Sequence, residues 1–324
     1  MSLKIYGKQH AIDAVTAMHK SGRLPHSYII YGKNGVGKKT FAKYLAMELL
    51  CEENGDTPCC KCRACRNITA DIHPDVIRVE HTGKLMGFSV ETIRNICHDA
   101  YIRPNNAERK IYVFTDAGNI TVQAQNALLK LIEEPPQFLY FIFTAESKSV
   151  FLDTILSRAV SIGLSECTGS EAAAALTEMD FSQEDISSAT NIFHGNIGLC
   201  AEYIRSDELK SKVELTKRLT DCIINRDEYG LLAAFSQVEN DKAAAKAVLS
   251  MLNDQLRDTL AAKYSDSQPT GCYPAGAARL ASRLTAAACE RLRLPIQEAY
   301  IRIDMNVSLK LILSCLCGQI MNER

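Results

Sequence analysis

The stretch GKNGVGKKT, residues 32–40, decides the fold class because its glycines and lysine have the spacing of a phosphate-binding loop. In a loop of the form G-x-x-x-x-G-K-[ST], the glycines let backbone N–H groups surround phosphate oxygens. The lysine reaches the terminal phosphates, and a hydroxyl coordinates magnesium. The apolar run HSYIIY precedes this loop and the helical pattern TFAKYLAMELL follows it. The sequence therefore predicts an α/β domain of the nucleotide-binding type.

One position of the loop departs from the pattern. Where a serine or threonine is expected, the chain has Lys39, which offers no oxygen to a metal ion and whose ammonium would occupy or repel the magnesium position. Thr40 lies one residue further on, about 100° around the helix. We expect no hydrolysis by the usual route, and whether the loop still binds a nucleotide stays open. The predicted phosphate contacts are Gly32, Gly35, Gly37 and Lys38.

A second departure follows the predicted strand KIYVFT, residues 110–115. Such a strand ordinarily leads to an aspartate that holds the magnesium shell and a glutamate that orients the attacking water. Here Asp116 is followed by Ala117, which cannot polarise water. Asp116 is either the remnant of a metal site or the cap of a strand end. Two catalytic groups are thus missing while the glycines remain, which indicates a scaffold kept for its shape.

Short apolar runs alternate with helical stretches between residues 27 and 164. Near-continuous apolar strands separated by helices indicate a mostly parallel sheet covered on both faces. From residue 167 onwards the strand signal disappears and the pattern is helical. We predict three domains, an α/β domain over 1–165, a small helical lid over 166–206 and an all-helical domain over 207–324. The predicted strands are SYIIY (27–31), PDVIRV (74–79), KIYVFT (110–115), LYFIFT (139–144) and AVSIGL (159–164).

Five of the thirteen cysteines crowd into residues 51–65, and four of them have the spacing C-x₇-C-x₂-C-x₂-C. Four thiolates so close in sequence can close a tetrahedral zinc site without an open position, so we predict structural zinc. An iron–sulfur site would have a further cysteine where Thr69 stands. Free buried cysteines, His73 as a ligand, and Cys60 in place of Cys59 are the alternatives. The predicted ligands are Cys51, Cys59, Cys62 and Cys65.

Composition limits the possible functions. With 37 basic and 38 acidic residues the chain does not coat nucleic acid by charge alone. An odd number of cysteines suits a reducing cytosol better than a disulfide framework. There is neither a cleavable N-terminal signal pattern nor an apolar run of roughly 18 residues. We therefore expect a cytoplasmic protein without a membrane partner.

Four features, in this order and at this spacing, resemble the AAA+ subunits of the bacterial sliding-clamp loader of DNA polymerase III. The resemblance is close over about residues 5–165, weaker over the lid and only architectural beyond it. It implies an AAA+ domain with a zinc-finger insertion, a lid, and a helical collar domain for oligomer assembly. The features are GKQHAIDAVTAMHKSGRLPHSYIIYGKNGVGKKT (7–40), the cysteine cluster, NALLKLIEEPP (126–136) and TILSRA (154–159).

Within that family, the gamma or tau motor subunit keeps a complete phosphate loop, an Asp-Glu pair and a sensor arginine in the lid, whereas the delta-prime type commonly lacks them. This chain has Lys39, the pair Asp116-Ala117 and Gly198 at those places. The resemblance therefore favours the delta-prime type, a DNA polymerase III holoenzyme component without ATPase activity of its own. It implies gamma/tau and delta subunits as partners, and contact with the sliding clamp and primed DNA through the complex.

The resemblance also assigns roles to single residues. Arg158 matches the family's Ser-Arg-Cys motif, with Ala159 for the cysteine. This implies an arginine offered to a neighbour's ATP site, where such fingers contribute on the order of 10³ or more in rate. The alternative is a pair with a carboxylate on its own surface. Thr144 matches a phosphate-sensing position, which we interpret here as a strand-end hydroxyl. The family's glycine at the position of Cys60 favours Cys59 as the ligand.

Two rival functions stay open. The first is an active gamma-type ATPase that tolerates Lys39 and orients the attacking water with another residue. The second is a stand-alone zinc-bearing DNA-binding protein, against which the near-neutral net charge weighs. Magnesium-dependent ATP turnover by the chain would support the first, and salt-dependent DNA binding by the isolated chain would support the second.

Overall fold

The computed structural model describes residues 3–22, 24–53, 55, 57–79, 81, 87–264, 271–305 and 307–322. The chain divides into two compact units, residues 1–171 and 172–324. Among the helices in these described ranges, none combines the length and the apolar character that crossing a membrane requires.

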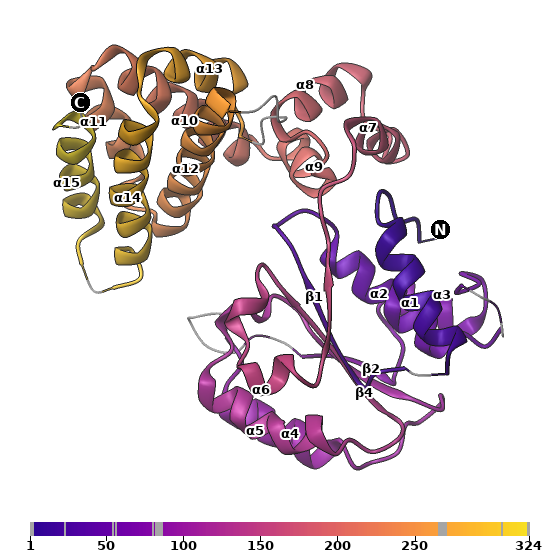
Figure 1. Cartoon of the computed structure of the whole chain (residues 1–324). Helices are drawn as coiled ribbons and strands as arrows, with labels where there is room; N and C mark the ends of the chain where they lie inside the picture. The colour runs from indigo at the N-terminus through magenta and orange to yellow at the C-terminus, as the bar shows by residue number, and fades with distance from the viewer. Residues whose placement is uncertain are drawn as a thin grey trace. The chain divides into compact units, whose positions relative to one another are not determined.

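A five-stranded parallel sheet forms the centre of the first unit, with the strand order β2-β3-β4-β1-β5 (Figure 1). Thr144 of β4 lies opposite Ile30 of β1, and Phe143 lies opposite Phe114 of β3. The carboxyl ends of β1, β3 and β4 therefore meet at one edge of the sheet, which confirms the predicted parallel architecture. The strands are β1 (Ser27–Tyr31), β2 (Val76–Val79), β3 (Lys110–Phe114), β4 (Leu139–Ala145) and β5 (Val160–Gly163).

Helices cover both faces of this sheet because alternate residues of each buried strand point to opposite sides. Tyr140 and Ile142 of β4 belong to the core shared with α1, α2 and α3. Phe141 and Phe143 belong to the core shared with α4, α5 and α6 on the other face (Figure 1). These helices are α1 (Gln9–Lys20), α2 (Lys38–Leu50), α3 (Arg63–Thr69), α4 (Val90–Asp99), α5 (Val122–Glu133) and α6 (Asp153–Leu156).

The second unit is helical throughout its described residues. One apolar core joins α7, α8 and α9 to Leu209 and Val213 of α10. A second core is shared by all the helices from α10 through α15. The separate lid and collar domains, with their boundary at residue 206, stay a prediction. The helices are α7 (Gly169–Thr177), α8 (Gln183–Phe193), α9 (Ile197–Arg205), α10 (Asp207–Asn225), α11 (Glu228–Phe235), α12 (Lys242–Tyr264), α13 (Pro274–Arg283), α14 (Ala286–Arg302) and α15 (Leu309–Asn322).

Candidate functional site

The phosphate loop connects β1 to α2 and has a backbone that requires glycine. Gly35 and Gly37 adopt φ angles of 81° and 93°, in the left-handed region where a side chain is strained. A Cβ atom on Gly32 would lie 2.3 Å from the carbonyl oxygen of Leu164, so the loop packs directly against the chain that follows β5. The predicted loop geometry is therefore present, with its first turn of helix starting at Lys38.

Lys38 is buried and turns back onto the loop. Its Nζ donates hydrogen bonds to the carbonyl oxygens of Gly32 at 2.8 Å and Lys33 at 2.9 Å. Desolvation by burial lowers the pKa of Lys38 below its usual value. Thr40 follows in the same turn of α2 and is half-buried. The loop lysine is therefore held in place by the loop itself.

Lys39 forms an ion pair with the carboxylate that an ATPase would use to hold magnesium. Its Nζ lies 2.6 Å from Asp116 Oδ2, and both side chains are well exposed, at 62% and 46%. Asp116 follows β3 with a φ angle of 54°, and Ala117 begins a short 3₁₀ turn behind it. The fold thus brings the loop and the end of β3 together, with the Lys39 ammonium between them.

Thr144 supports this arrangement from the neighbouring strand. Its side chain is fully buried, and its Oγ1 accepts a hydrogen bond of 2.9 Å from the backbone N–H of Asp116. The hydroxyl therefore satisfies a backbone donor at the point where Asp116 takes up its left-handed conformation. This contact corresponds to the strand-end role that the sequence suggested for Thr144.

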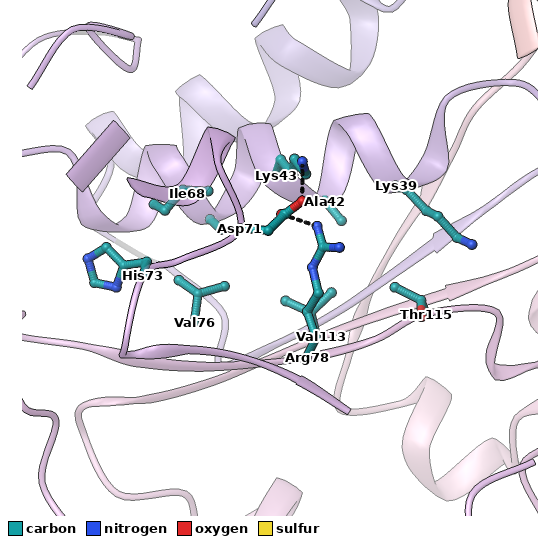
Figure 2. A pocket seen from close by; sticks show the side chains of 11 residues that line it. Lys39, Ala42, Lys43, Ile68, Asp71, His73, Val76, Arg78, Val113 and Thr115 are labelled. Carbon is teal, nitrogen blue, oxygen red and sulfur yellow. Dashed lines mark hydrogen bonds and ion pairs between the residues drawn. The ribbon is translucent and has the colours of Figure 1, made fainter. Parts of the chain in front are cut away.

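Sequence reasoning did not identify a neighbouring ion-pair cluster. A pocket of about 30 Å³ lies between α2 and the strands β2 and β3. Figure 2 shows its lining side chains, with Lys39 and Thr115 at one end. Lys43 of α2 lies 2.8 Å from Asp71, and Arg78 of β2 pairs with the same carboxylate (Figure 2). The only sequence signal was the i,i+4 spacing of Lys39 and Lys43 on one helix face. Asp71 therefore neutralises two of the cations that face the pocket.

Arg158 lies between α6 and β5 and contacts three acceptors on its own chain. Its Nη2 is 3.0 Å from Glu133 Oε1, while Nη1 donates to the carbonyl oxygen of Thr154 at 3.0 Å and to Ser157 Oγ at 3.1 Å. This is the own-surface pair that the sequence left as an alternative. Because both charged side chains are more than 40% exposed, the pair contributes only about 0–1 kcal/mol to stability.

The four predicted cysteine ligands form one cluster. Their sulfur atoms all lie within 4.8 Å of one another, and Cys59 Sγ is 4.0 Å from Cys65 Sγ. Tetrahedral zinc with Zn–S bonds of about 2.3 Å places its sulfurs about 3.8 Å apart, so the four thiols fit the metal. The cluster spans the end of α2, where Cys51 caps the helix, and the start of α3, where Cys62 is the N-cap.

Backbone N–H groups surround the sulfur of Cys59. Hydrogen bonding from the N–H of Lys61, with a further contribution from that of Cys62, lowers the pKa of Cys59 to about 7. The Cys62 N–H lies 3.2 Å from this sulfur, and Cys65 N lies 3.4 Å from the sulfur of Cys62. Such donors favour the thiolate form, which is the form that binds metals.

Cys60 and His73 lie outside this cluster within the described part of the chain. Cys60 has a φ angle of 57°, and its thiol donates to the carbonyl oxygen of Pro58 at 3.5 Å. A left-handed backbone favours glycine, which is the residue that the resembling family has at this position. His73 Nδ1 accepts a hydrogen bond from the N–H of Asp75. Of the two cysteines that the sequence left open, Cys59 is the one whose sulfur lies in the cluster.

Comparison with known proteins agrees with the motifs. The family described as "DNA polymerase III, delta subunit" matches residues 7–168. The gamma subunit of DNA polymerase III from Buchnera aphidicola is 32% identical over 50% of this chain and 44% of its own length. The delta' subunit from Bacillus subtilis is 30% identical over 60% of this chain and 59% of its own length. The delta' subunit from Escherichia coli is 27% identical over 84% of this chain and 81% of its own length. The chain thus spans less than half of the first relative and most of the last.

Proposed function

The chain belongs to the DNA polymerase III delta-subunit family of clamp-loader proteins, and from this premise we propose that it acts as the delta-prime subunit of a sliding-clamp loader. It hydrolyses no ATP itself and offers Arg158 to the ATP site of an adjacent gamma/tau subunit. Gamma/tau and delta subunits are its direct partners, and it reaches the clamp and primed DNA through the complex. It acts in the cytoplasm, where it takes part in loading the clamp during DNA replication.

The ion pair between Lys39 and Asp116 carries the proposal that this subunit does not hydrolyse ATP. Magnesium needs near-octahedral oxygen ligands at about 2.0–2.1 Å and dehydrates reluctantly. To bind here it would have to displace an ammonium from Asp116, and it would still lack the hydroxyl that position 39 ordinarily supplies. Ala117 removes the group that would orient the attacking water. Metal binding and water activation are therefore both impaired.

The exposure of Arg158 supports its proposed role in trans. The guanidinium lies on the surface, and its pair with Glu133 is weak enough to coexist with a new anion. Arginine is suited to this role because its planar fork remains charged and binds phosphate oxygens bidentately.

We further propose that the four-cysteine cluster holds a structural zinc ion. Four sulfur ligands would leave no open position for a substrate, so the metal would pin the segment between α2 and α3 rather than take part in chemistry. In this account the zinc sets the shape of the module and has no part in ATP turnover.

An active gamma/tau-like ATPase is the second candidate, and the retained glycine backbone and the buried Lys38 favour it. The two accounts differ for the chain alone. The delta-prime account predicts no magnesium-dependent ATP turnover above the blank, whereas the ATPase account requires it. A chain that turns over ATP alone and loses this activity in the Lys38→Met variant would replace our proposal by the second.

The experiment that tests the proposed role is ATP turnover by a loader reconstituted from this chain and its partner subunits, with clamp and primed DNA. We expect Arg158→Ala to lower turnover at least about tenfold, because a trans finger is worth on the order of 10³ at the site it serves. Subunit assembly should be unchanged, since the residue lies on the surface. Unchanged turnover would reduce Arg158 to a surface residue.

A further inference from the structure

We propose that Glu133 is a positioning residue for Arg158, holding its guanidinium in one orientation before a neighbour's phosphate arrives. The proposal rests on the proposed function, since it assumes that Arg158 acts in trans. Glu133 would not touch the nucleotide. Its effect would be exerted entirely through the arginine.

The contacts of Arg158 leave one edge of its guanidinium group accessible to a phosphate. A guanidinium carries five N–H donors. In the described part of the chain, the Nη1 donors contact Thr154 and Ser157, and one Nη2 donor contacts Glu133. Nε makes none of these contacts, and it shares one edge of the guanidinium plane with Nη2. Two parallel donors on one edge are the arrangement that binds a phosphate oxygen pair.

Glu133 is essential to this orientation because the other two acceptors come from residues adjacent to Arg158. Thr154 belongs to α6 and Ser157 caps it, so both acceptors lie on the same short segment as Arg158. Glu133 belongs to α5, which packs against one face of the sheet together with α4 and α6. Among the described residues, only the contact with Glu133 therefore joins the guanidinium to a separate element of the domain.

The core fixes α5 and α6 relative to each other. Gln125 of α5 is buried, its Nε2 donates to the carbonyl oxygen of Val150 at 2.9 Å, and its Oε1 accepts from the N–H of Leu152 at 2.8 Å. Ile155 of α6 is buried in the same core as Leu131 of α5. Gln125 thus holds the start of the segment 150–158. Glu133, two helical turns further along α5, contacts the end of the same segment at Arg158.

The end of α5 is itself determined by the sequence. Pro135 and Pro136 cannot continue the helix, so the last helical residue is Glu133, followed by Glu134. A carboxylate in the last turn of a helix is electrostatically unfavourable because the carbonyl end carries partial negative charge. Arg158 compensates this carboxylate. A surface pair of this kind contributes little to stability, which suits a role in orientation.

The test is a double-mutant cycle in the reconstituted loader, with Glu134→Ala as the matched control one residue away. We expect Glu133→Ala to lower ATP turnover with clamp and primed DNA about three- to tenfold through kcat, with the KM for ATP and subunit assembly unchanged. Glu133→Gln keeps an oxygen acceptor and should stay within about twofold of wild type. Glu134→Ala should equal wild type.

In the Arg158→Ala background, Glu133→Ala should cause no further loss, because its whole effect passes through the arginine. A further loss in that background, or a Glu133→Ala loader as active as wild type while Arg158→Ala is impaired, would overturn the positioning role alone. An Arg158→Ala loader with wild-type turnover would overturn the proposed function, and the positioning role with it.

Discussion

Lys39 Nζ lies 2.6 Å from Asp116 Oδ2, so the residue that replaces the magnesium-binding hydroxyl neutralises the carboxylate that would share the same metal. The departure at position 39 therefore also occupies the aspartate that the ATPase pattern retains at position 116. The buried hydroxyl of Thr144 holds the backbone of Asp116 in place behind this pair. The loop thus keeps its glycine backbone and has an ammonium group paired with Asp116.

Replacing Lys39 by threonine should restore a response to magnesium. The Lys39→Thr variant removes the ammonium from Asp116 and returns a hydroxyl to the eighth position of the loop. We expect it to bind a fluorescent ATP analogue at least about tenfold more tightly with Mg²⁺ than with EDTA, while ATP turnover stays absent because Ala117 is unchanged. The Lys43→Thr variant, one turn along the same helix, is the control and should show no such response. Equal affinities with and without magnesium for Lys39→Thr would contradict the assignment of Lys39 as the block.

Thr144 should matter for stability rather than for turnover. The Thr144→Val variant leaves the N–H of Asp116 without its acceptor, and an unsatisfied buried donor costs about 1–3 kcal/mol. Urea unfolding of the first unit should report this loss. The exposed Thr154→Val variant should lie within about 0.5 kcal/mol of wild type. A neutral Thr144→Val variant would mean that Asp116 finds another acceptor.

The cysteine cluster gives a prediction with an internal control. The purified chain should carry about one zinc ion, and Cys62→Ser should lose it, because the cluster then has three thiolates. Cys60→Ser should retain the metal, since its sulfur lies outside the cluster. Metal analysis of the variants measures this directly. The reverse pattern, with zinc lost from Cys60→Ser and kept in Cys59→Ser, would exchange the two ligands.

Gly32 should tolerate no side chain. Its Cβ would lie 2.3 Å from the carbonyl oxygen of Leu164, a backbone atom that cannot move without disturbing the chain after β5. We expect Gly32→Ala to lower the free energy of unfolding by roughly 2–3 kcal/mol. Gly118→Ala is the control, because nothing lies within 4 Å of its added Cβ. Thermal or urea unfolding of the two variants should separate them clearly.

The sequence predicted the sheet and the loop because their signals are local. Buried parallel strands read as short apolar runs, and the loop geometry is imposed by glycines at fixed spacing. The cysteine spacing likewise predicted a four-sulfur cluster. The choice between Cys59 and Cys60 could not be made from spacing alone, since it depends on the left-handed backbone at Cys60.

The contacts on which the proposed function rests were not predictable from the sequence, because they join residues far apart in the chain. Nothing in the local sequence pairs Lys39 with Asp116, or Arg158 with Glu133, since each pair is made by elements that the sheet brings together. The sequence analysis gave a pair between Arg158 and a surface carboxylate as one alternative, but it did not identify the carboxylate. Apart from the spacing of Lys39 and Lys43 on one helix face, nothing in the sequence indicated that Asp71 would neutralise Lys43 and Arg78.

The central claim is that this chain serves a neighbour's ATP site and not its own. The most direct measurement is ATP turnover by the reconstituted loader, with clamp and primed DNA, comparing Lys38→Met with Arg158→Ala. Lys38 belongs to the chain's own phosphate loop, whereas Arg158 faces outward. Our account predicts that Lys38→Met turns over ATP like wild type and that Arg158→Ala is at least about tenfold slower. Loss of turnover in Lys38→Met with an unaffected Arg158→Ala would contradict it and identify the chain as an ATPase in its own right.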